Sequence, residues 1–310
     1  MNHAAPGEYG VITKAGDYVA DGGPEGGGKR YVGGKAGMAG LSSALLRAGD
    51  LDENELVTCQ FNTTVRSIAP ILSGDSFHGW SLHSSDVALG EFQWLVVSSK
   101  IVAHPLWSQI VGGEPPLAIA ASQLDDPGLL AAVAEIAKVN VQPCVVALLA
   151  FSGEAAEAWA AMPFLRARVQ DDRILRRVVV QRVHQTLTTV ALHSTTEFAE
   201  VSSQTRDDSE DLETSQALLD AMIARFVPKC LAPEHVVPAW GPYLHRWSSA
   251  FPNAPHFQLE SAHPLAARVV FCGDYLGGPF AESMEGAAIS GQMAADAIKL
   301  HLPSLMEDTL

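Results

Sequence analysis

The sequence has few basic residues, no closely spaced cysteines and no apolar run long enough to cross a membrane. Its 20 Lys and Arg residues stand against 35 Asp and Glu residues, which gives a formal net charge of −15. A field of that sign repels polyanions, so we expect no nucleic-acid partner. Because no apolar stretch reaches the roughly 18 residues of a membrane span, we expect no membrane partner either.

Paired metal-binding or disulfide spacings are also missing. None of the four cysteines belongs to a C-x-x-C pair (Cys59, Cys144, Cys230 and Cys272). This predicts reduced, mostly buried thiols in a soluble intracellular protein. The histidines show no H-E-x-x-H or His-x-His spacing, and the three between His245 and His263 lie in sequence typical of loops. We therefore predict no metal site.

Basic residues are concentrated in one stretch, residues 166 to 182, which carries six arginines within strand-like sequence. A surface that binds single-stranded nucleic acid would interleave aromatic residues on which bases stack. None is interleaved here, so we interpret the arginines as solvated strand faces and a turn.

At 310 residues the chain has room for one large domain or two interleaved ones. The Gly-rich residues 1–34 show no pattern and are predicted as loop. The remaining pattern predicts a helix over 37–46, an antiparallel meander from 56–61, 63–68 and 80–83, a doubly buried strand over 93–98, and a helix or turn beginning at Pro105. It continues with a helix over 129–138, a strand over 143–151, a hairpin of 174–181 with 187–193, and an amphipathic helix over 212–226.

A strand over 268–272, a Gly-rich turn over 273–278 and a helix over 283–301 carry the main functional signal. Gly273 allows the backbone to approach a ligand, and Asp274 can accept hydrogen bonds from a polyol at the strand's carboxyl end. The amides around Met284, Glu285 and Gly286 then direct a helix N-terminus at an electron-rich ring edge. Any β-turn-α unit shares the outline, but this motif specifies several further residue types.

The string from Phe271 to Gly291 resembles the C-terminal flavin-contacting motif of the amine oxidase, phytoene desaturase and renalase superfamily. It is similar in particular to the plant and algal renalase-like group. The resemblance implies that Gly273 and Asp274 bind the ribityl and pyrophosphate part of FAD. It also implies that the helix start faces the O2 and N1 edge of the flavin, through Ser283, Met284, Glu285 and Gly286.

Other segments are similar to the same family in the same order. Residues 29–38 resemble the start of its first helix, and residues 94–100 resemble a strand of its nucleotide-binding sheet. The resemblance implies that the backbone of Val65 brackets the adenine and that Trp247 packs beside the flavin. A plain core tryptophan is the alternative for Trp247. Tyr275 either edges the same pocket or lies at the surface.

The resemblance implies an α/β fold of the FAD-dependent amine-oxidase or renalase-like type, with an incomplete nucleotide-binding sheet and a mixed or antiparallel substrate domain. We expect a loop-rich segment at 1–34, FAD-binding remnants at 35–112 and 264–301, and a substrate domain at 113–263. The implied activity is hydride transfer from a small-molecule substrate to FAD. No residue can be assigned as the catalytic acid or base.

Such enzymes hold FAD with a strand followed by G-x-G-x-x-G and a helix, and no segment here supplies it. The segment from Lys35 to Gly40 has lysine at the first glycine position. We therefore expect an N-terminally truncated relative in which FAD is bound weakly or not at all. A truncated gene model or splice form, a fragment completed by another chain and a degenerate homologue remain alternatives. A plastid location would follow if an upstream transit peptide were missing.

Two other functions stay open. The first is a noncatalytic or partner-dependent homologue that acts through protein interaction, as a homo-oligomer or with a complementing chain. The second is an unrelated NAD-dependent reductase that uses the turn from Gly34 to Gly40. That reading requires a strand before Gly33, which the sequence does not show.

Overall fold

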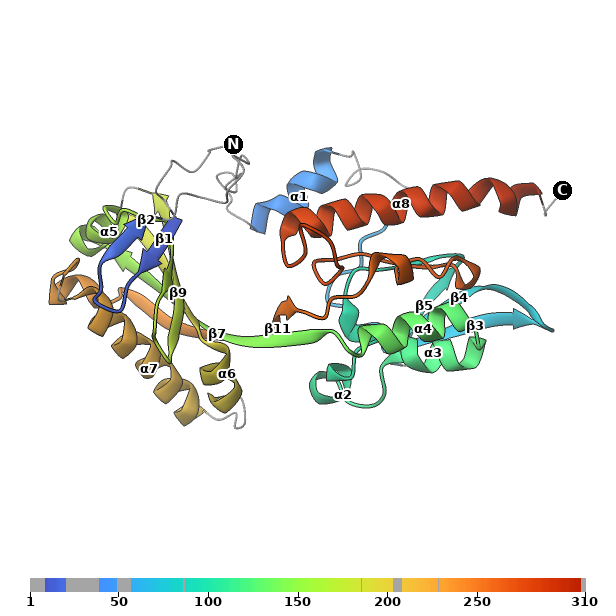
Figure 1. Cartoon of the computed structure of the whole chain (residues 1–310), viewed down its shortest axis with the longest axis horizontal. Coiled ribbons are helices and arrows are strands. Elements are labelled where there is room, and N and C mark those ends of the chain that lie inside the picture. The colour runs from blue at the N-terminus through green and yellow to red at the C-terminus, as the bar shows by residue number, and fades with distance from the viewer. Residues whose placement is uncertain are drawn as a thin grey trace. The chain divides into compact units, whose positions relative to one another are not determined.

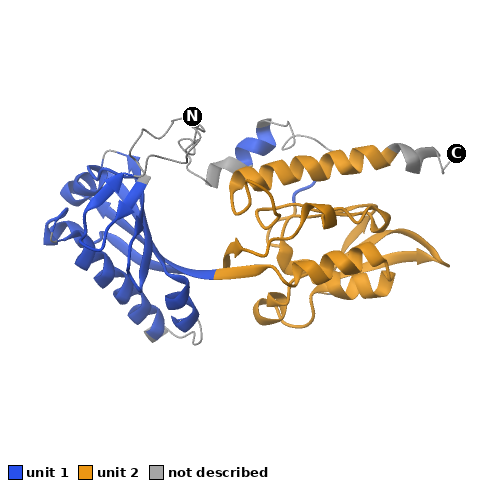
Figure 2. Ribbon diagram, in the orientation of Figure 1, with its two compact units in different colours: residues 1–59, 143–247 blue, residues 60–142, 248–310 orange. Residues whose placement is uncertain are grey.

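The computed structural model describes residues 9–20, 39–48, 57–85, 87–184, 186–202, 208–227 and 229–307, and Figure 1 labels many of their helices and strands. The chain forms two compact units, coloured separately in Figure 2. Unit 1 comprises Met1–Cys59 and Pro143–Trp247, and unit 2 comprises Gln60–Gln142 and Ser248–Leu310. Each unit is therefore built from two separate stretches of sequence. The assignment of one unit to a cofactor and the other to a substrate stays a prediction.

A mixed sheet of seven strands organises unit 1, in the order β11-β7-β10-β9-β8-β1-β2. Its strands are β1 (Tyr9–Ile12), β2 (Tyr18–Ala20), β7 (Asn140–Ser152), β8 (Arg166–Val169), β9 (Leu175–His184), β10 (Leu187–Ser194) and β11 (Trp240–Asn253). Strand β1 pairs with β8 in parallel, whereas β9 and β10 form an antiparallel hairpin. The hairpin predicted from the sequence is confirmed, with Val190 opposite Val180.

One face of this sheet carries the hydrophobic core of unit 1. Along β10 the residues alternate between buried (Thr188, Val190, Leu192) and partly exposed, as a strand packed on one face requires. Helices α5 (Gly153–Ala160) and α7 (Asp208–Phe226) contribute to the same core, and α6 (Thr196–Ser202) follows β10 (Figure 1). The Trp159 ring of α5 lies 5.7 Å from the Phe226 ring of α7, measured between centroids.

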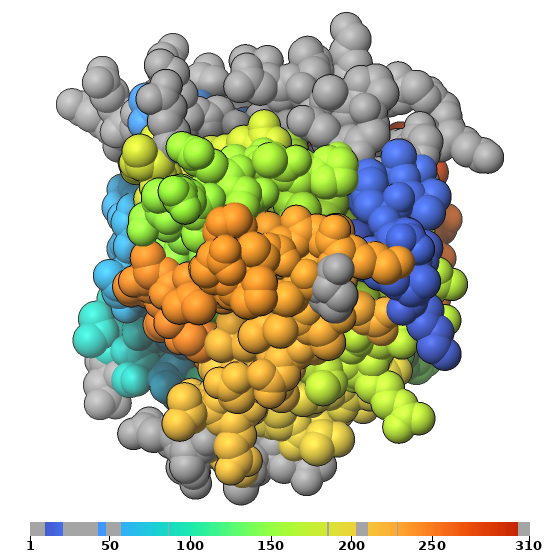
Figure 3. All heavy atoms as spheres, turned by 90° about the vertical axis from the view of Figure 1, so that its left-hand side faces the viewer, coloured from blue at the N-terminus to red at the C-terminus, as the bar shows by residue number. Residues whose placement is uncertain are grey.

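The loop after α7 closes one end of unit 1. It contains the short 3₁₀ helix η2 (Pro233–Val236), whose His235 carbonyl accepts a hydrogen bond from the Trp159 indole at 3.0 Å. Figure 3 shows this segment in orange at the centre of that end, with β1 and β2 in dark blue at one side.

The structure corrects the prediction of loop over residues 1–34, because residues 9–12 and 18–20 are strands. Both are short, with four and three residues, so they show no hydrophobic alternation. Gly10 makes their pairing feasible, since a Cβ atom there would overlap the Tyr18 ring and the Val19 carbonyl oxygen. The segment over residues 29–38 lies outside the described residues.

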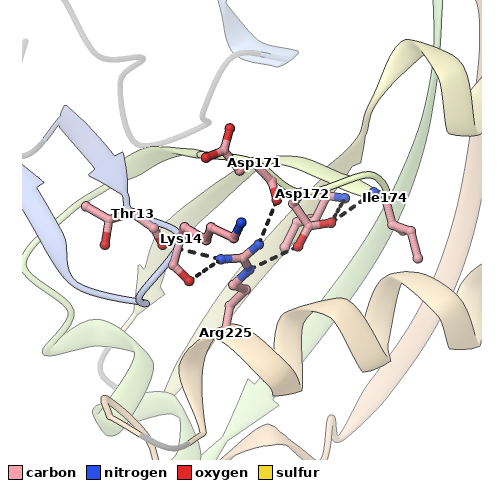
Figure 4. A network of polar contacts seen from close by, with 7 residues as sticks. Thr13, Lys14, Asp171, Asp172, Ile174 and Arg225 are labelled. Atoms are coloured by element: carbon pink, nitrogen blue, oxygen red, sulfur yellow. Dashed lines mark hydrogen bonds and ion pairs between the residues drawn. The ribbon is translucent and has the colours of Figure 1, made fainter.

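Arg225, near the end of α7, forms hydrogen bonds that connect the β1–β2 turn to the loop between β8 and β9 (Figure 4). Its Nη1 donates to the carbonyl oxygens of Thr13 and Lys14, at 3.3 and 2.8 Å. Its Nη2 donates to the Asp171 carbonyl oxygen at 3.2 Å, and its Nε donates to Asp172 Oδ2 at 3.0 Å. Residues more than 200 positions apart are thus joined by one side chain, which no local pattern could have indicated.

Unit 2 combines an antiparallel meander, a parallel pair of strands and several helices. Its strands are β3 (Ser67–Ser73), β4 (Ser76–Ser84), β5 (Val87–Phe92), β6 (Leu95–Val97) and β12 (Val269–Phe271). Its helices are η1 (Lys100–Val102), α2 (Leu106–Ile110), α3 (Pro116–Leu124), α4 (Pro127–Ile136), η3 (Leu259–Ser261), η4 (Leu265–Ala267) and α8 (Met284–Glu307), while α1 (Ala39–Ala48) belongs to unit 1. An antiparallel meander is present, formed by β3, β4 and β5. The predicted strands over 56–61 and 63–68 are wrong, because residues 57–66 form no regular structure, and only 80–83 falls entirely within an observed strand, β4.

Two further expectations are wrong. Strand β6 was predicted to be buried on both faces, yet Val96 is 55% exposed between the buried Leu95 and Val97. Residues 245–253 were expected in a loop, yet they belong to β11. Strand β11 is the last strand of its sheet, and an edge strand tolerates residues such as Pro242 and Pro252 that a central strand excludes.

Candidate functional site

The candidate site lies at the carboxyl ends of the parallel strands β6 and β12. The last paired residues are Val97 and Phe271, and the amide of Cys272 donates to the Val97 carbonyl oxygen at 3.1 Å. Beyond this pair, β6 leads to Lys100 and β12 leads to Asp274. In open α/β sheets ligands bind in the crevice at this edge, so both side chains belong to the candidate site.

Gly273 is required by the packing of its own turn. Its φ of +143° is one that residues with a side chain rarely adopt. A Cβ atom there would lie 2.5 Å from Cε1 of Tyr275 and 3.1 Å from the Ser98 carbonyl oxygen. Glycine is therefore required at position 273 by the fold itself, whether or not a ligand binds there. Contact between Gly273 and a ligand stays a prediction.

Tyr275 is part of the core, which corrects the expectation that it edges a pocket or lies at the surface. Its side chain is almost fully buried, at 1% exposure, and its hydroxyl donates to the Val97 carbonyl oxygen at 3.0 Å. Burial raises the pKa of this phenol far above its ordinary value, and the nearby Cys272 and Asp274 raise it further. Tyr275 is therefore a neutral hydrogen-bond donor and not a general base.

The start of α8 is fixed by its own side chains. Ser283 caps the helix, since its Oγ accepts a hydrogen bond from the Gly286 amide at 3.0 Å. A Cβ atom at Gly286 would overlap the Phe280 carbonyl oxygen, so glycine allows the preceding loop to lie against the helix. Ser283 and Gly286 thus build the helix N-terminus, whatever it binds.

The first amides of α8 remain available for a ligand. In the described part of the chain, no group accepts a hydrogen bond from the backbone N–H of Met284 or Glu285. These amides lie at the positive end of a 24-residue helix. An electron-rich group placed there would gain both hydrogen bonds and a favourable dipole.

The loop before α8 is held by Glu282, which has a positive φ of +63°. Its amide donates to the Asp274 carbonyl oxygen at 2.9 Å. Its carboxylate Oε1 lies 2.9 Å from His256 Nε2. The backbone of Asp274 is therefore tied to the helix start, which fixes where its side chain leaves the turn.

Lys100 is the residue of this site that the sequence reasoning passed over. It is only 7% exposed, and its Nζ lies 5.7 Å from the centroid of the Tyr275 ring. Burial lowers the pKa of the ammonium group, while the charge of Asp274 acts in the opposite direction. The one sequence signal was its place directly after an apolar strand, and that signal says nothing about burial.

His104, four residues further on, has a structural role. Its Nδ1 accepts a hydrogen bond from the Leu106 amide at 3.1 Å, so Nε2 carries the proton and donates to the Val139 carbonyl oxygen at 3.0 Å. Burial lowers the pKa of the imidazole, the bond to Val139 opposes this, and the charge of Lys100 lowers the pKa further. Both ring nitrogens are engaged with backbone, which keeps His104 neutral.

The other predicted cofactor residues lie elsewhere. Val65 packs against the core of unit 2, the same core that contains Tyr275. Trp247 is the last residue of unit 1 and is 52% exposed, so a plain core tryptophan is excluded. Its ring meets the His245 ring edge-on, with centroids 4.5 Å apart. The contacts of Val65 with an adenine and of Trp247 with a flavin stay predictions.

Arg246, which lies between His245 and Trp247 in the sequence, is committed to the fold of unit 1. Its Nη2 lies 2.6 Å from Asp211 Oδ1, and its Nη1 donates to the Ser202 carbonyl oxygen at 2.6 Å.

Other groups of chemical interest are sparse in the described residues. They hold no cluster of three or more His, Cys, Asp or Glu side chains suited to a metal ion. All four cysteines are free, but only Cys144 and Cys272 are buried, so the expectation of mostly buried thiols is half right. None of the helices that the structure describes combines the length and the apolar character needed to span a membrane.

Comparison with known proteins decides the fold. No protein-family model matches the sequence, and no curated protein matches it. Cyclohexylamine oxidase from Brevibacterium oxydans IH-35A superposes with a TM-score of 0.54 and 17% identity, over 86% of this chain and 53% of that chain. A variant of putrescine oxidase with redesigned cofactor binding gives a TM-score of 0.51 and 14% identity, over 87% and 54%.

The chain has the fold of these amine oxidases. This confirms the predicted α/β fold class. The chain spans about half the length of these oxidases, 53% and 54%. The carboxyl edge of β6 and β12 and the start of α8 both belong to unit 2, where the Glu282 amide in the loop before α8 donates to the Asp274 carbonyl oxygen.

Proposed function

We propose that this chain is a flavin-dependent oxidoreductase of the amine-oxidase or renalase-like kind. In this proposal unit 2 holds FAD and a small-molecule substrate is oxidised. Bound FAD would supply the hydride acceptor, which no amino-acid side chain can provide. The amine-oxidase-like fold supports the flavin part of the proposal.

The donor set at the strand ends carries the proposal. Asp274 offers a carboxylate that can accept hydrogen bonds from ribityl hydroxyls. The free amides of Met284 and Glu285 can donate to the electron-rich edge of an isoalloxazine ring. Lys100 adds a buried ammonium group, which suits an anionic part of the same molecule. These residues fit FAD in chemistry, because they combine acceptors for its hydroxyls with donors for its anionic and carbonyl oxygens.

Val65 completes the proposed set of contacts within unit 2. Its backbone would bracket the adenine. No side chain of the described site acts as a base in this proposal, because Tyr275 and His104 are both committed to backbone carbonyls. Orientation of the substrate and exclusion of water are the tasks left to the protein.

Flavin binding tests the function directly. Purified protein should show visible flavin absorbance, or should acquire it with excess FAD and retain it through gel filtration. The Asp274→Asn variant should weaken FAD binding by about tenfold, because it removes a charged acceptor. Asp75→Asn, in the exposed β3–β4 turn, is the matched control and should bind as the wild type does. Protein that stays colourless with excess FAD would overturn the proposal.

A partner-dependent, noncatalytic role is the second candidate, and the exposure of Val96 favours it. Parallel strands are usually buried on both faces, yet Val96 is 55% exposed in the parallel pair of β6 and β12. A homo-oligomer or a complementing chain would cover it. Colourless protein that associates with itself in sedimentation, and becomes monomeric on Val96→Lys substitution, would support this role instead.

A further inference from the structure

We propose that Lys100 binds a phosphate oxygen of a sugar-phosphate or polyol-phosphate ligand whose neighbouring hydroxyls are held by Asp274. The inference rests on the proposed function where that ligand is taken to be the pyrophosphate part of FAD. It assigns a ligand contact to a residue outside the motif that pointed to a flavin.

Lys100 lies beyond the carboxyl end of β6, and most of the residue is buried. It opens η1, immediately beyond the end of β6, and it is 93% buried by its 7% exposure. Its Nζ lies over the Tyr275 ring, 5.7 Å from the centroid, and that ring is itself pinned by its bond to the Val97 carbonyl oxygen. The contact with the Tyr275 ring therefore positions the ammonium group near the carboxyl end of β6 and β12.

The ammonium group of Lys100 lacks a hydrogen-bond acceptor. It has three N–H donors, and within the described ranges none makes a hydrogen bond or an ion pair. The nearby Val97 carbonyl oxygen already accepts from Tyr275 and Cys272, and His104 presents a donor at Nε2. An ammonium group that has no acceptor among the described residues is free to donate hydrogen bonds to an anionic oxygen of a ligand.

Asp274 narrows the chemistry of that anion. Its carboxylate is close enough for its charge to act on Lys100, but the two form no ion pair within 4.0 Å. A carboxylate only accepts hydrogen bonds and an ammonium group only donates them. A ligand that serves both must carry hydrogen-bond donors, such as hydroxyls, beside an anionic oxygen. Sugar phosphates and polyol phosphates have this arrangement, and a simple carboxylate or amine does not.

The test compares Lys100→Met with Lys138→Met, which removes the same charge from an exposed position of the same unit. The probes are FAD, riboflavin and inorganic pyrophosphate, titrated by calorimetry. We expect Lys100→Met to weaken FAD and pyrophosphate binding by about tenfold or more and to leave riboflavin binding unchanged. The ligand-free variant should melt no lower than the wild type, because a buried charge has been removed. Lys138→Met should change none of these values.

Several results would overturn the inference. Equal FAD affinity in Lys100→Met and wild type would do so while leaving the flavin function intact. Equal losses for FAD and riboflavin would place Lys100 on the ring and not on a phosphate. A lower melting temperature with proportionate loss of every ligand would show a purely structural role. Lys100→Gln replaces Lys100→Met if the latter does not fold, with the same expected results.

The two proposals can fail separately. Wild-type protein that binds pyrophosphate through Lys100 but takes up no FAD would retain the inference and overturn the flavin function. Wild-type protein that binds neither probe would overturn both.

Discussion

The Ser290 hydroxyl accepts a hydrogen bond from the Gly273 amide, with oxygen and nitrogen 2.9 Å apart. Ser290 is buried in the second turn of α8, and Gly273 follows β12. The same hydroxyl lies 2.9 Å from the Ala287 carbonyl oxygen and 3.3 Å from that of Gly273, and its single proton can serve one of them. One small side chain therefore sets the helix start against the strand end.

Ser290→Ala should lower the free energy of unfolding by roughly 1–2 kcal/mol, because it leaves the Gly273 amide without its acceptor. Urea unfolding followed by circular dichroism measures this loss. Gln292→Ala removes an exposed polar side chain of the same helix and should change the unfolding free energy by less than about 0.5 kcal/mol. Equal effects of the two substitutions would show that the bond to Gly273 contributes nothing.

Two glycines of α8 should respond to alanine in opposite directions. A Cβ atom at Gly286 would overlap the Phe280 carbonyl oxygen, whereas one at Gly291 meets no atom within 4 Å. Gly286→Ala should destabilise the protein by about 1–3 kcal/mol through overpacking. Gly291→Ala should stabilise it by up to about 1 kcal/mol, because alanine favours the helix interior. The melting temperature of each variant, compared with that of the wild type, tests this prediction. Two changes in the same direction would contradict the described packing of the loop on α8.

Asp172 should make the protein sensitive to strong acid. Burial raises the pKa of its carboxyl group, but hydrogen bonds from the amides of Leu175 and Ile174 and the charge of Arg225 outweigh this and lower it overall. Because the folded pKa lies below the unfolded one, the stabilisation is complete above the unfolded value near 3.8 and is lost as pH falls through the folded value.

Asp172→Asn should therefore reduce stability at neutral pH by about 1–3 kcal/mol and should flatten the loss of stability below about pH 4. Unfolding free energy measured against pH tests both effects. Asp171→Asn is the matched control, because Asp171 contributes only its carbonyl oxygen to Arg225. If Asp171→Asn lowers stability as much as Asp172→Asn does, the Asp172 carboxylate is not the cause of the acid sensitivity.

His193 should govern stability at milder acidity. It lies opposite Arg177 across β10 and β9, and burial, together with the charges of Arg177, Arg166 and Arg176, lowers its pKa to about 4. Between pH 6.5 and about 4 the unfolded chain binds a proton that the folded chain does not, so stability falls as pH falls across this window. The total loss should be on the order of 2–3 kcal/mol.

Replacing His193 by Gln should remove that dependence. His184→Gln, at the exposed end of the same hairpin, should retain it. Chemical shifts of the imidazole protons give the titration directly, and a midpoint near 6.5 for His193 would contradict the proposed cause.

Local patterns predicted the part of the fold where local signals are strong. The apolar run at residues 268–272, the glycines after it and the helix from Ser283 onward predicted β12 and the start of α8 within one residue of their observed limits. The end of α8 was predicted at residue 301, whereas the helix continues to Glu307. The glycines were recognised for their freedom, but a sequence cannot say what comes close to them. At Gly273 and Gly286 the protein atoms that come close belong to Tyr275 and Phe280.

What the sequence did not show depends on distant residues. The β1–β2 pair has too few residues to display a pattern and is fastened by Arg225, more than 200 positions away. The arginines of residues 166–182 were interpreted as solvated, which holds for Arg168, Arg173 and Arg182, while Arg166, Arg176 and Arg177 are partly buried. Nothing in the sequence around Lys100 indicates that it is buried, because its burial and its contact with the Tyr275 ring depend on residues far away in the chain.

Strands β7 and β11 carry the chain from one unit to the other, since the limits at 142/143 and 247/248 fall inside Asn140–Ser152 and Trp240–Asn253 (Figure 2). Insertion or exchange of a chain segment is tolerated mainly in exposed loops, because a loop can absorb a change in length without moving buried side chains. Here an exchange of either unit needs several simultaneous crossovers, two of them within strands, where a shift of one residue reverses which side chains face the core. The two units are thus expected to be inherited as a single piece.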